Sequence, residues 1–119
     1  MKNYESAEDY LETILMISKE KEYVISKDIV EKTGYSKPSI SIAMKKLRDK
    51  GFINIDDKHK ITLTDEGFDI AKHVLDRHET LTEFFKKLGV NEVTAAEDAC
   101  RMEHFLSEES YNKIKDWIN

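Results

Sequence analysis

The stretch SKPSISIAMKKLRDKG, residues 36–51, carries a helix start at one end and a helix stop at the other. Ser36 is a residue type that caps helix N-termini, and Pro38 falls in the first turn, where its missing N–H costs nothing. Gly51 is the residue type that most often follows a helix end. The apolar residues between these ends recur at helical spacing and form one stripe: Ile40, Ala43, Met44 and Leu47. We therefore predict a helix with one buried face and one exposed face.

The flanking segments extend this helix into a winged helix-turn-helix. Upstream, Ser26 can cap a short helix that ends at Thr33-Gly34, and an amphipathic first helix is expected over residues 6–19. Two short helices joined by a turn that contains Gly are typical of a helix-turn-helix. Downstream, the alternating runs 52–55 and 61–64 flank a charged loop, and this pattern predicts a β-hairpin, the wing.

The rest of the chain is predicted to be helical. Thr64 can cap a long helix, a further helix is expected over about residues 91–106, and Ser107 can cap a last one. The predicted fold class is therefore mostly α with a small β-hairpin. We expect two domains, a winged helix-turn-helix over residues 1–70 followed by a helical lobe over residues 71–119.

Charge is distributed unevenly along the chain. The net charge is −5 at pH 7, yet residues 35–60 hold seven basic side chains against three acidic ones. This segment therefore carries +4 and the remainder carries −9. A basic segment on an acidic protein is typical of a surface that binds a polyanion, although a basic helix face can also be merely solvated.

Composition disfavours membrane and secreted proteins. No run approaches the ~20 apolar residues that cross a bilayer, and the first residues lack the apolar stretch of a secretory signal. Cys100 is the lone cysteine, which excludes an intrachain disulfide and suits a reducing compartment. We therefore expect a cytoplasmic protein without a membrane partner.

The exposed side of the helix over residues 36–51 offers groups that bind DNA. Hydroxyl groups can bond to base edges or phosphates, and lysines neutralise phosphates. Serines near a helix start can equally be simple caps, and both interpretations stay open. The candidate DNA-binding residues on this helix and the hairpin loop are Ser36, Lys37, Pro38, Ser39, Ser41, Lys45, Lys46, Lys58 and Lys60.

Metal-binding side chains stand where the predicted helices turn inward. Three donors at i, i+3 and i+4 share one face of the penultimate helix, and a histidine interrupts the apolar stripe of the long helix. Two acids three residues apart share one side of the first helix. Buried polar groups need partners, which a divalent cation supplies, but a buried His or Cys can also be an ordinary core residue. The candidate ligands are Asp9, Glu12, His78, Cys100, Glu103 and His104.

The chain resembles the diphtheria-toxin-repressor family of metalloregulators, which includes iron-dependent repressors and manganese transport regulators. Its stretch CRMEH, residues 100–104, is similar to the Cys-x-x-Glu-His signature of that family. Further matches occur in the same order at residues 8–12, 36–41, 63–67 and 77–78. The resemblance therefore covers almost the whole chain.

This resemblance implies a metal-dependent transcriptional repressor that is not an enzyme. We expect a homodimer that binds double-stranded operator DNA when Mn²⁺ or Fe²⁺ is bound, with residues 71–119 as the dimerisation and metal-binding lobe. Zn²⁺, Co²⁺ or Ni²⁺ can substitute in vitro, because affinity for such sites follows the Irving–Williams order. The chain looks like a short form of the family, without the extra C-terminal domain of its longer members.

The resemblance also implies a mixed ligand set. The manganese-type ligand positions match Asp9, Glu12, His78, Glu103 and His104. Cys100 instead follows the iron-type pattern, whereas manganese regulators usually have a carboxylate there. Thr82 and Ala96 stand where iron-type members have a carboxylate and a His. Either two metals bind with Cys100 as one ligand, or one metal binds tightly.

Two other functions compete with this hypothesis. A winged-helix regulator could respond to a small organic ligand or to oxidation of Cys100. A metalloenzyme would need a substrate pocket, a base distinct from the ligands or a Gly-rich phosphate loop, and the sequence supplies none of them. No small-molecule substrate is therefore expected.

Overall fold

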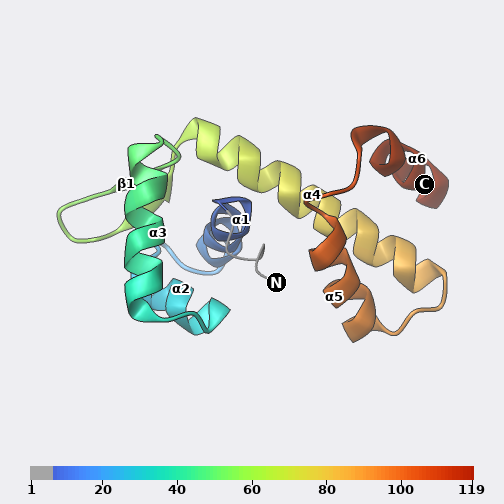
Figure 1. Cartoon of the computed structure of the whole chain (residues 1–119), viewed down its shortest axis with the longest axis horizontal. Coiled ribbons are helices and arrows are strands. Elements are labelled where there is room, and N and C mark those ends of the chain that lie inside the picture. Colours follow the sequence, from blue (N-terminus) through green and yellow to red (C-terminus); the bar gives the residue numbers. More distant parts are fainter. Residues whose placement is uncertain (1–6) are drawn as a thin grey trace. The chain divides into compact units, whose positions relative to one another are not determined.

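The computed structural model describes residues 7–119, which form helices and a single two-stranded sheet. The predicted class, mostly α with one small hairpin, is confirmed (Figure 1). The chain divides into two compact units, Met1–Lys72 and His73–Asn119, and the long helix α4 (Asp65–Lys87) contributes residues to both. A search of the described helices for one long and apolar enough to cross a membrane finds none.

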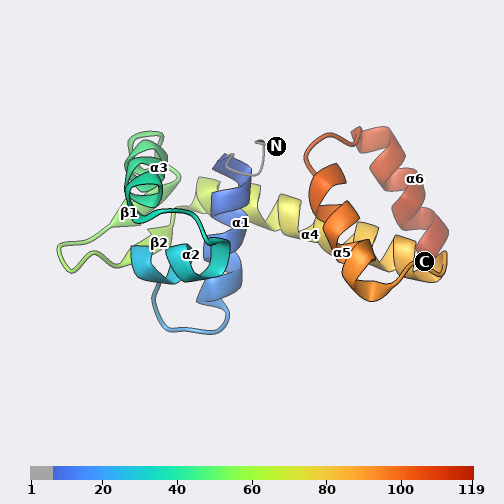
Figure 2. The same cartoon turned by 60° about the horizontal axis from the view of Figure 1, so that its bottom comes forward.

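The first unit is built around three helices and the hairpin (Figures 1 and 2). Its elements are α1 (Ala7–Ser18), α2 (Ser26–Thr33), α3 (Lys37–Asp49), β1 (Ile53–Ile55) and β2 (Ile61–Leu63). Each element contributes large apolar side chains that are almost fully buried, among them Leu11, Ile14, Ile29, Ile40, Met44, Ile53 and Ile61. The predicted start of the first helix at residue 6 lies outside the described residues.

The ends of α3 follow the sequence prediction. The Ser36 hydroxyl accepts a hydrogen bond from the backbone N–H of Ser39 at 3.2 Å, and proline occupies the first turn. Gly51 follows the C-cap residue Lys50 and takes a left-handed conformation, with φ of 82°. The N–H of Phe52 then bonds to the carbonyl of Leu47 at 3.0 Å, which satisfies a terminal carbonyl of the helix.

The start of α2 differs from the prediction that Ser26 caps it. Ile25 is the N-cap residue, and Ser26 is already the first helical residue. The carboxylate of Asp28 reaches back and accepts a hydrogen bond from the Ile25 N–H at 3.0 Å. Lys21 holds the other oxygen of the same carboxylate at 2.7 Å. A carboxylate in the first turn also interacts favourably with the positive end of the helix dipole. Asp28 therefore stabilises the N-terminus of α2, where a Ser26 cap was expected.

The hairpin pairs β1 with β2 in antiparallel register, with Asn54 opposite Thr62. A further bridge joins Ile61 to Val24, whose carbonyl accepts from the Ile61 N–H at 2.7 Å; the sequence pattern did not predict it. At the tip, the Asp56 carboxylate accepts hydrogen bonds from two backbone N–H groups of the loop, each at 2.9 Å. The wing is therefore anchored at its base and closed by a side chain at its tip.

The second unit consists of the C-terminal part of α4 with α5 (Glu92–Met102) and α6 (Glu108–Ile118) (Figure 2). Ser107 caps α6 as predicted, by accepting from the Ser110 N–H at 3.0 Å. The helix predicted over residues 91–106 instead ends at Met102. Its buried residues are Ala95 and Ala99, whereas Val93 is 65% exposed.

Gly67 allows the first turn of α4 to approach the hairpin. A Cβ atom at this position would lie 2.0 Å from the carbonyl oxygen of Phe52 and 2.9 Å from its carbonyl carbon. The same junction is closed by Thr64, whose hydroxyl donates to the Gly51 carbonyl at 2.8 Å and accepts from the Gly67 N–H at 3.1 Å. Backbone atoms cannot move aside as a flexible side chain can, so only glycine fits here.

We predict that Gly67→Ala lowers the free energy of unfolding by about 1–3 kcal/mol, the usual cost of overpacking. An ordinary Gly→Ala change inside a helix stabilises it by roughly 0.5–1 kcal/mol, so the expected sign is reversed. Urea denaturation of the two proteins measures the difference. Asp69→Ala, at an exposed position of the same helix, is the control and should stay within about 0.5 kcal/mol of the wild type. Unchanged or higher stability of Gly67→Ala would contradict the close approach.

Candidate functional site

The outer face of α3 collects most of the candidate DNA-binding residues. Ile40, Met44 and Leu47 bury the inner face, and every residue proposed for DNA contact on this helix is exposed. These exposed residues are Ser36, Lys37, Pro38, Ser39, Ser41, Lys45 and Lys46. The Ser36 hydroxyl also donates to that of Ser39 at 2.9 Å, so Ser36 serves both as a cap and as part of this surface.

The two lysines of the wing have different surroundings. Lys58 lies exposed at the tip. Lys60 is half-buried, and its ammonium group lies 4.2 Å from the centre of the Tyr23 ring. A cation over an aromatic face is attracted by the ring quadrupole, which limits the motion of the Lys60 side chain. The sequence analysis did not identify Tyr23 as a partner, because the two residues lie far apart along the chain.

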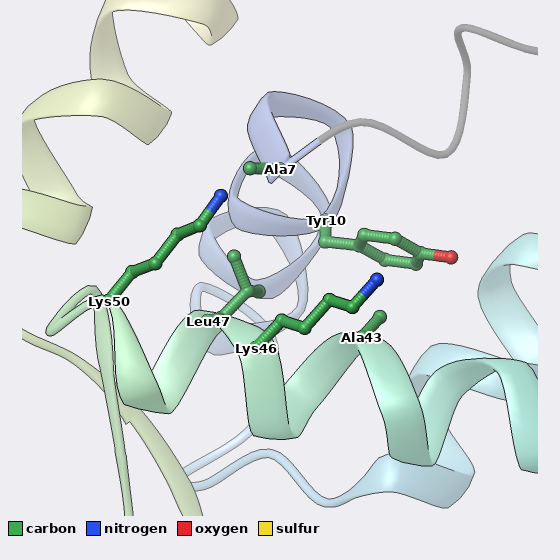
Figure 3. Close-up of a pocket in the computed structure, with 6 residues that line it drawn as sticks. All are labelled: Ala7, Tyr10, Ala43, Lys46, Leu47 and Lys50. Carbon is green, nitrogen blue, oxygen red and sulfur yellow. The ribbon is translucent and has the colours of Figure 1, made fainter.

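A basic pocket lies between α1 and α3 (Figure 3). It has a volume of about 210 Å³, and Lys46 and Lys50 extend from α3 toward α1, with the Tyr10 ring beside Lys46. Its wall is completed by Ala7, Ala43 and Leu47. Two cationic side chains one helical turn apart at such a pocket favour an anionic ligand group over a cationic one.

A buried carboxylate forms the centre of the second candidate site. The Glu103 side chain is 0% exposed, and its Oε1 lies 2.9 Å from Nδ1 of His78. Its other oxygen, Oε2, lies 3.4 Å from Nε2 of His104 but accepts no hydrogen bond from the described residues. An oxygen that is buried without a hydrogen bond is costly for the fold, and a cation can offset that cost. The cluster therefore has the donor chemistry of a divalent-metal site.

Arg77 fixes the chain segment that carries this carboxylate. Its Nη1 donates to the carbonyl oxygen of Glu103 at 3.1 Å and to that of Leu106 at 2.6 Å. Its Nη2 donates to the Glu108 carboxylate at 2.6 Å, and the guanidinium lies 5.0 Å from the centre of the Tyr111 ring. The side chain is only 7% exposed. The turn from α5 to α6 is thus tied to α4 at the position next to His78.

Arg77 was missed as a site residue, although its sequence neighbour was proposed as a ligand. A basic residue next to a histidine carries no signal of its own in the sequence. The deciding contacts are to backbone carbonyls 26 and 29 positions away, which only the fold brings together.

The remaining candidate ligands occupy three other positions. Asp9 is half-buried and Glu12 is buried, both on α1 in the first unit. Cys100 is half-buried on α5 and forms no disulfide within the described residues. Glu103 caps the end of α5, and His104 follows it, so the donors expected on one helix lie at and just beyond its last turn. Within the second unit the structure brings together His78, Glu103 and His104.

Comparison with known proteins identifies the family. Residues 3–60 match the model for the iron dependent repressor N-terminal DNA-binding domain, and residues 64–119 match the iron dependent repressor metal-binding and dimerisation domain. The chain belongs to the iron-dependent repressor family. Over 113 residues it is 41% identical to an HTH-type transcriptional regulator of Methanocaldococcus jannaschii, covering 93% of this chain and 90% of that one.

Two further relatives of this repressor are known by name. Over 113 residues it is 33% identical to the HTH-type transcriptional regulator MntR of Bacillus subtilis, covering 95% of this chain and 80% of that one. The structure of the manganese regulator SloR superposes with a TM-score of 0.84 at 27% identity. That alignment covers 96% of the repressor but only 54% of SloR, so the chain spans about half the length of this structural relative.

The repressor is therefore a metal-dependent transcriptional regulator and not an enzyme. The expected DNA-binding and dimerisation functions are both present as family domains. The expected resemblance to iron-dependent and manganese-dependent regulators is confirmed.

The hydrogen bond to Glu103 raises the pKa of the His78 ring above its usual value of about 6.5, and this effect outweighs the opposing effect of burial. Protonated His78 therefore stabilises the metal-free fold fully below its unfolded pKa, and this contribution is lost as the pH rises through the raised folded pKa. A metal ion binds the neutral ring, so a metal held at His78 would displace the same proton.

We predict that Glu103→Gln lowers the pKa of His78 in the metal-free repressor, because the amide keeps the shape of the side chain but removes its charge. NMR titration of the His78 ring protons measures the pKa in both proteins. Glu79→Gln, at an exposed neighbour whose charge acts more weakly on the ring, is the matched control and should shift it less. If the two variants gave equal shifts, the specific contact with Glu103 would not be the cause.

Proposed function

We propose that this repressor binds operator DNA as a homodimer when Mn²⁺ or Fe²⁺ is bound, and thereby controls genes of metal homeostasis. The observation that carries this proposal is the buried Glu103 carboxylate, which lies between the imidazoles of His78 and His104 with one oxygen free of hydrogen bonds from the described residues. The matched metal-binding family domain supports the same conclusion. Since its partner is chromosomal DNA, we place the repressor in the cytoplasm.

The proposed ligands are Asp9, Glu12, His78, Cys100, Glu103 and His104. Support for His78, Glu103 and His104 comes from their clustering, whereas Asp9, Glu12 and Cys100 rest on the resemblance to the family. Carboxylate oxygens suit Mn²⁺, and a thiolate suits softer ions. Because carboxylates outnumber the one thiol, and SloR is a manganese regulator, we favour Mn²⁺ over Fe²⁺.

The proposed division of labour follows the two parts of the chain. Residues 1–70 contact DNA, and residues 71–119 hold the metal and the dimer contact; the two matched family domains support this division. The proposed ligands come from both parts, so a metal held by all of them would supply a positive centre and would restrict the relative freedom of the two parts. In a dimer, that restriction favours two α3 helices spaced for successive major grooves, ~34 Å apart. By linkage, DNA then tightens metal binding by the same factor as metal tightens DNA binding.

The proposed DNA contact is made by α3 and the wing. The exposed start of α3 offers hydroxyl groups from Ser36, Ser39 and Ser41 to base edges or phosphates. Lys37, Pro38, Lys45 and Lys46 extend this surface along the helix, and Lys58 and Lys60 extend it on the wing. The family DNA-binding domain, which spans both elements, supports the assignment.

We predict that His104→Ala abolishes the effect of Mn²⁺ on operator binding, because it removes one donor from the cluster around Glu103. Fluorescence anisotropy with a DNA duplex selected by the wild type, with and without Mn²⁺, measures the effect. His73→Ala is the matched control, since His73 lies on α4 with its side chain 53% exposed. The ligand assignment would fail if His104→Ala kept the full Mn²⁺ response, or if His73→Ala lost it too.

We predict that the double variant Lys45→Ala, Lys46→Ala weakens binding to every DNA sequence and flattens its salt dependence. Each lost phosphate contact should remove about 0.9 from the slope of log K against log salt. Titrations at several salt concentrations measure the slope with Mn²⁺ held constant. Lys113→Ala, at an exposed position of α6 in the second unit, is the control and should leave the slope unchanged. An unaltered slope in the double variant would exclude both lysines from the DNA contact.

A further inference from the structure

Ile42 is the exception on an otherwise polar helix face. Its side chain is 58% exposed, whereas the other isoleucine of α3, Ile40, is fully buried. At 100° per residue, Ile42 points roughly 140–160° away from each of the three core residues Ile40, Met44 and Leu47. It therefore projects from the side of the helix opposite to the core, where it adds nothing to the packing of the unit.

The neighbours of Ile42 are residues proposed to bind DNA. It lines a shallow pocket together with Ser39, Ala43, Lys46 and the Tyr10 ring. Ser39 lies one turn before it and Lys46 one turn after it on the same side of α3. A single exposed apolar residue is normal on a protein surface. Ile42, however, lies on the exposed side of α3, between the hydroxyl group of Ser39 and the ammonium group of Lys46. This side would enter the major groove if α3 docks as a recognition helix.

The major groove offers an isoleucine one specific partner. Among the four bases, only thymine presents a methyl group there, at C5, beside its acceptor oxygen. A β-branched side chain has one strongly preferred χ1 rotamer in a helix, so Ile42 presents its methyl groups in a fixed direction and loses little freedom on contact. Shape and apolar character thus suit Ile42 to reading a methyl group, and it has no donor or acceptor with which to read the other bases.

We propose that Ile42 determines sequence preference by packing against the C5-methyl group of a thymine in the operator. This inference rests on the proposed DNA-binding role of α3 and adds to it a residue and a base that the other assignments leave open. The lysines around Ile42 position the helix on the DNA backbone, and Ile42 selects thymine at one position in each half-site.

The test removes the methyl group from the DNA and the side chain from the protein. Duplexes are first selected from a random library with the Mn²⁺-loaded wild type, and each thymine is then replaced singly by deoxyuridine, which differs only in lacking that methyl. The wild type should lose about fourfold in affinity at one position per half-site, the value of one buried methyl group. Ile42→Ala should bind the thymine and deoxyuridine duplexes equally at that position, and Ile42→Val should keep part of the preference.

Lys45→Ala is the matched control on the same helix. It should weaken binding to the thymine and deoxyuridine duplexes by the same factor, because a phosphate contact does not depend on the methyl group. The proposal is overturned if the wild type tolerates every deoxyuridine, or if Ile42→Ala keeps the full loss at the same position. Selection of no duplex at all by the Mn²⁺-loaded protein would instead refute the proposed function, and the role of Ile42 with it.

Discussion

The burial of one carboxylate constrains the helical half of this protein. Glu103 has no exposed side-chain surface, and an ionised carboxylate in such a place must be paired or hydrogen-bonded to persist. His78 satisfies one of its oxygens, and Arg77, the residue before it on α4, holds its backbone carbonyl. Two adjacent residues of one helix therefore fix both the side chain and the main chain of the same glutamate. The other oxygen lies 3.4 Å from the His104 ring and accepts no hydrogen bond within the described part of the chain.

The helical periodicity and the helix-end signals of α3 are sufficient to predict its position from the sequence. Its cap, its proline and its terminal glycine are local features that agree with the structure. Of the four residues predicted for its buried stripe, three are buried and Ala43 is only half-buried. The helix-end signals in the sequence were wrong at two places, the N-cap of α2 and the C-terminal end of α5. At α2 a carboxylate in the first turn performs the role expected of Ser26. At α5 the helix ends at Met102, and the carbonyls of Glu103 and Leu106 beyond it accept hydrogen bonds from Arg77 of α4.

The candidate metal site was predictable as a set of residue types but not as an arrangement. Spacing could place Cys100, Glu103 and His104 near one another, and a helical face could bring His78 inward. It could not show that Glu103 is the most deeply buried of the four, or that Arg77 orders the turn beneath it. Both facts depend on contacts between residues 25 or more positions apart, which no periodic pattern encodes.

The close approach of Gly67 to Phe52 has a mechanical consequence. Backbone lies directly against backbone there, and the Thr64 hydroxyl bonds across the same junction, so the first turn of α4 and the base of the wing share one rigid joint. No side chain lies between the two backbones, so a change of rotamer cannot accommodate a shift of one backbone against the other. We therefore expect a rotation of the first turn of α4 to move the base of the hairpin with it. The orientation of the wing relative to α4 therefore depends on the backbone contact at Gly67.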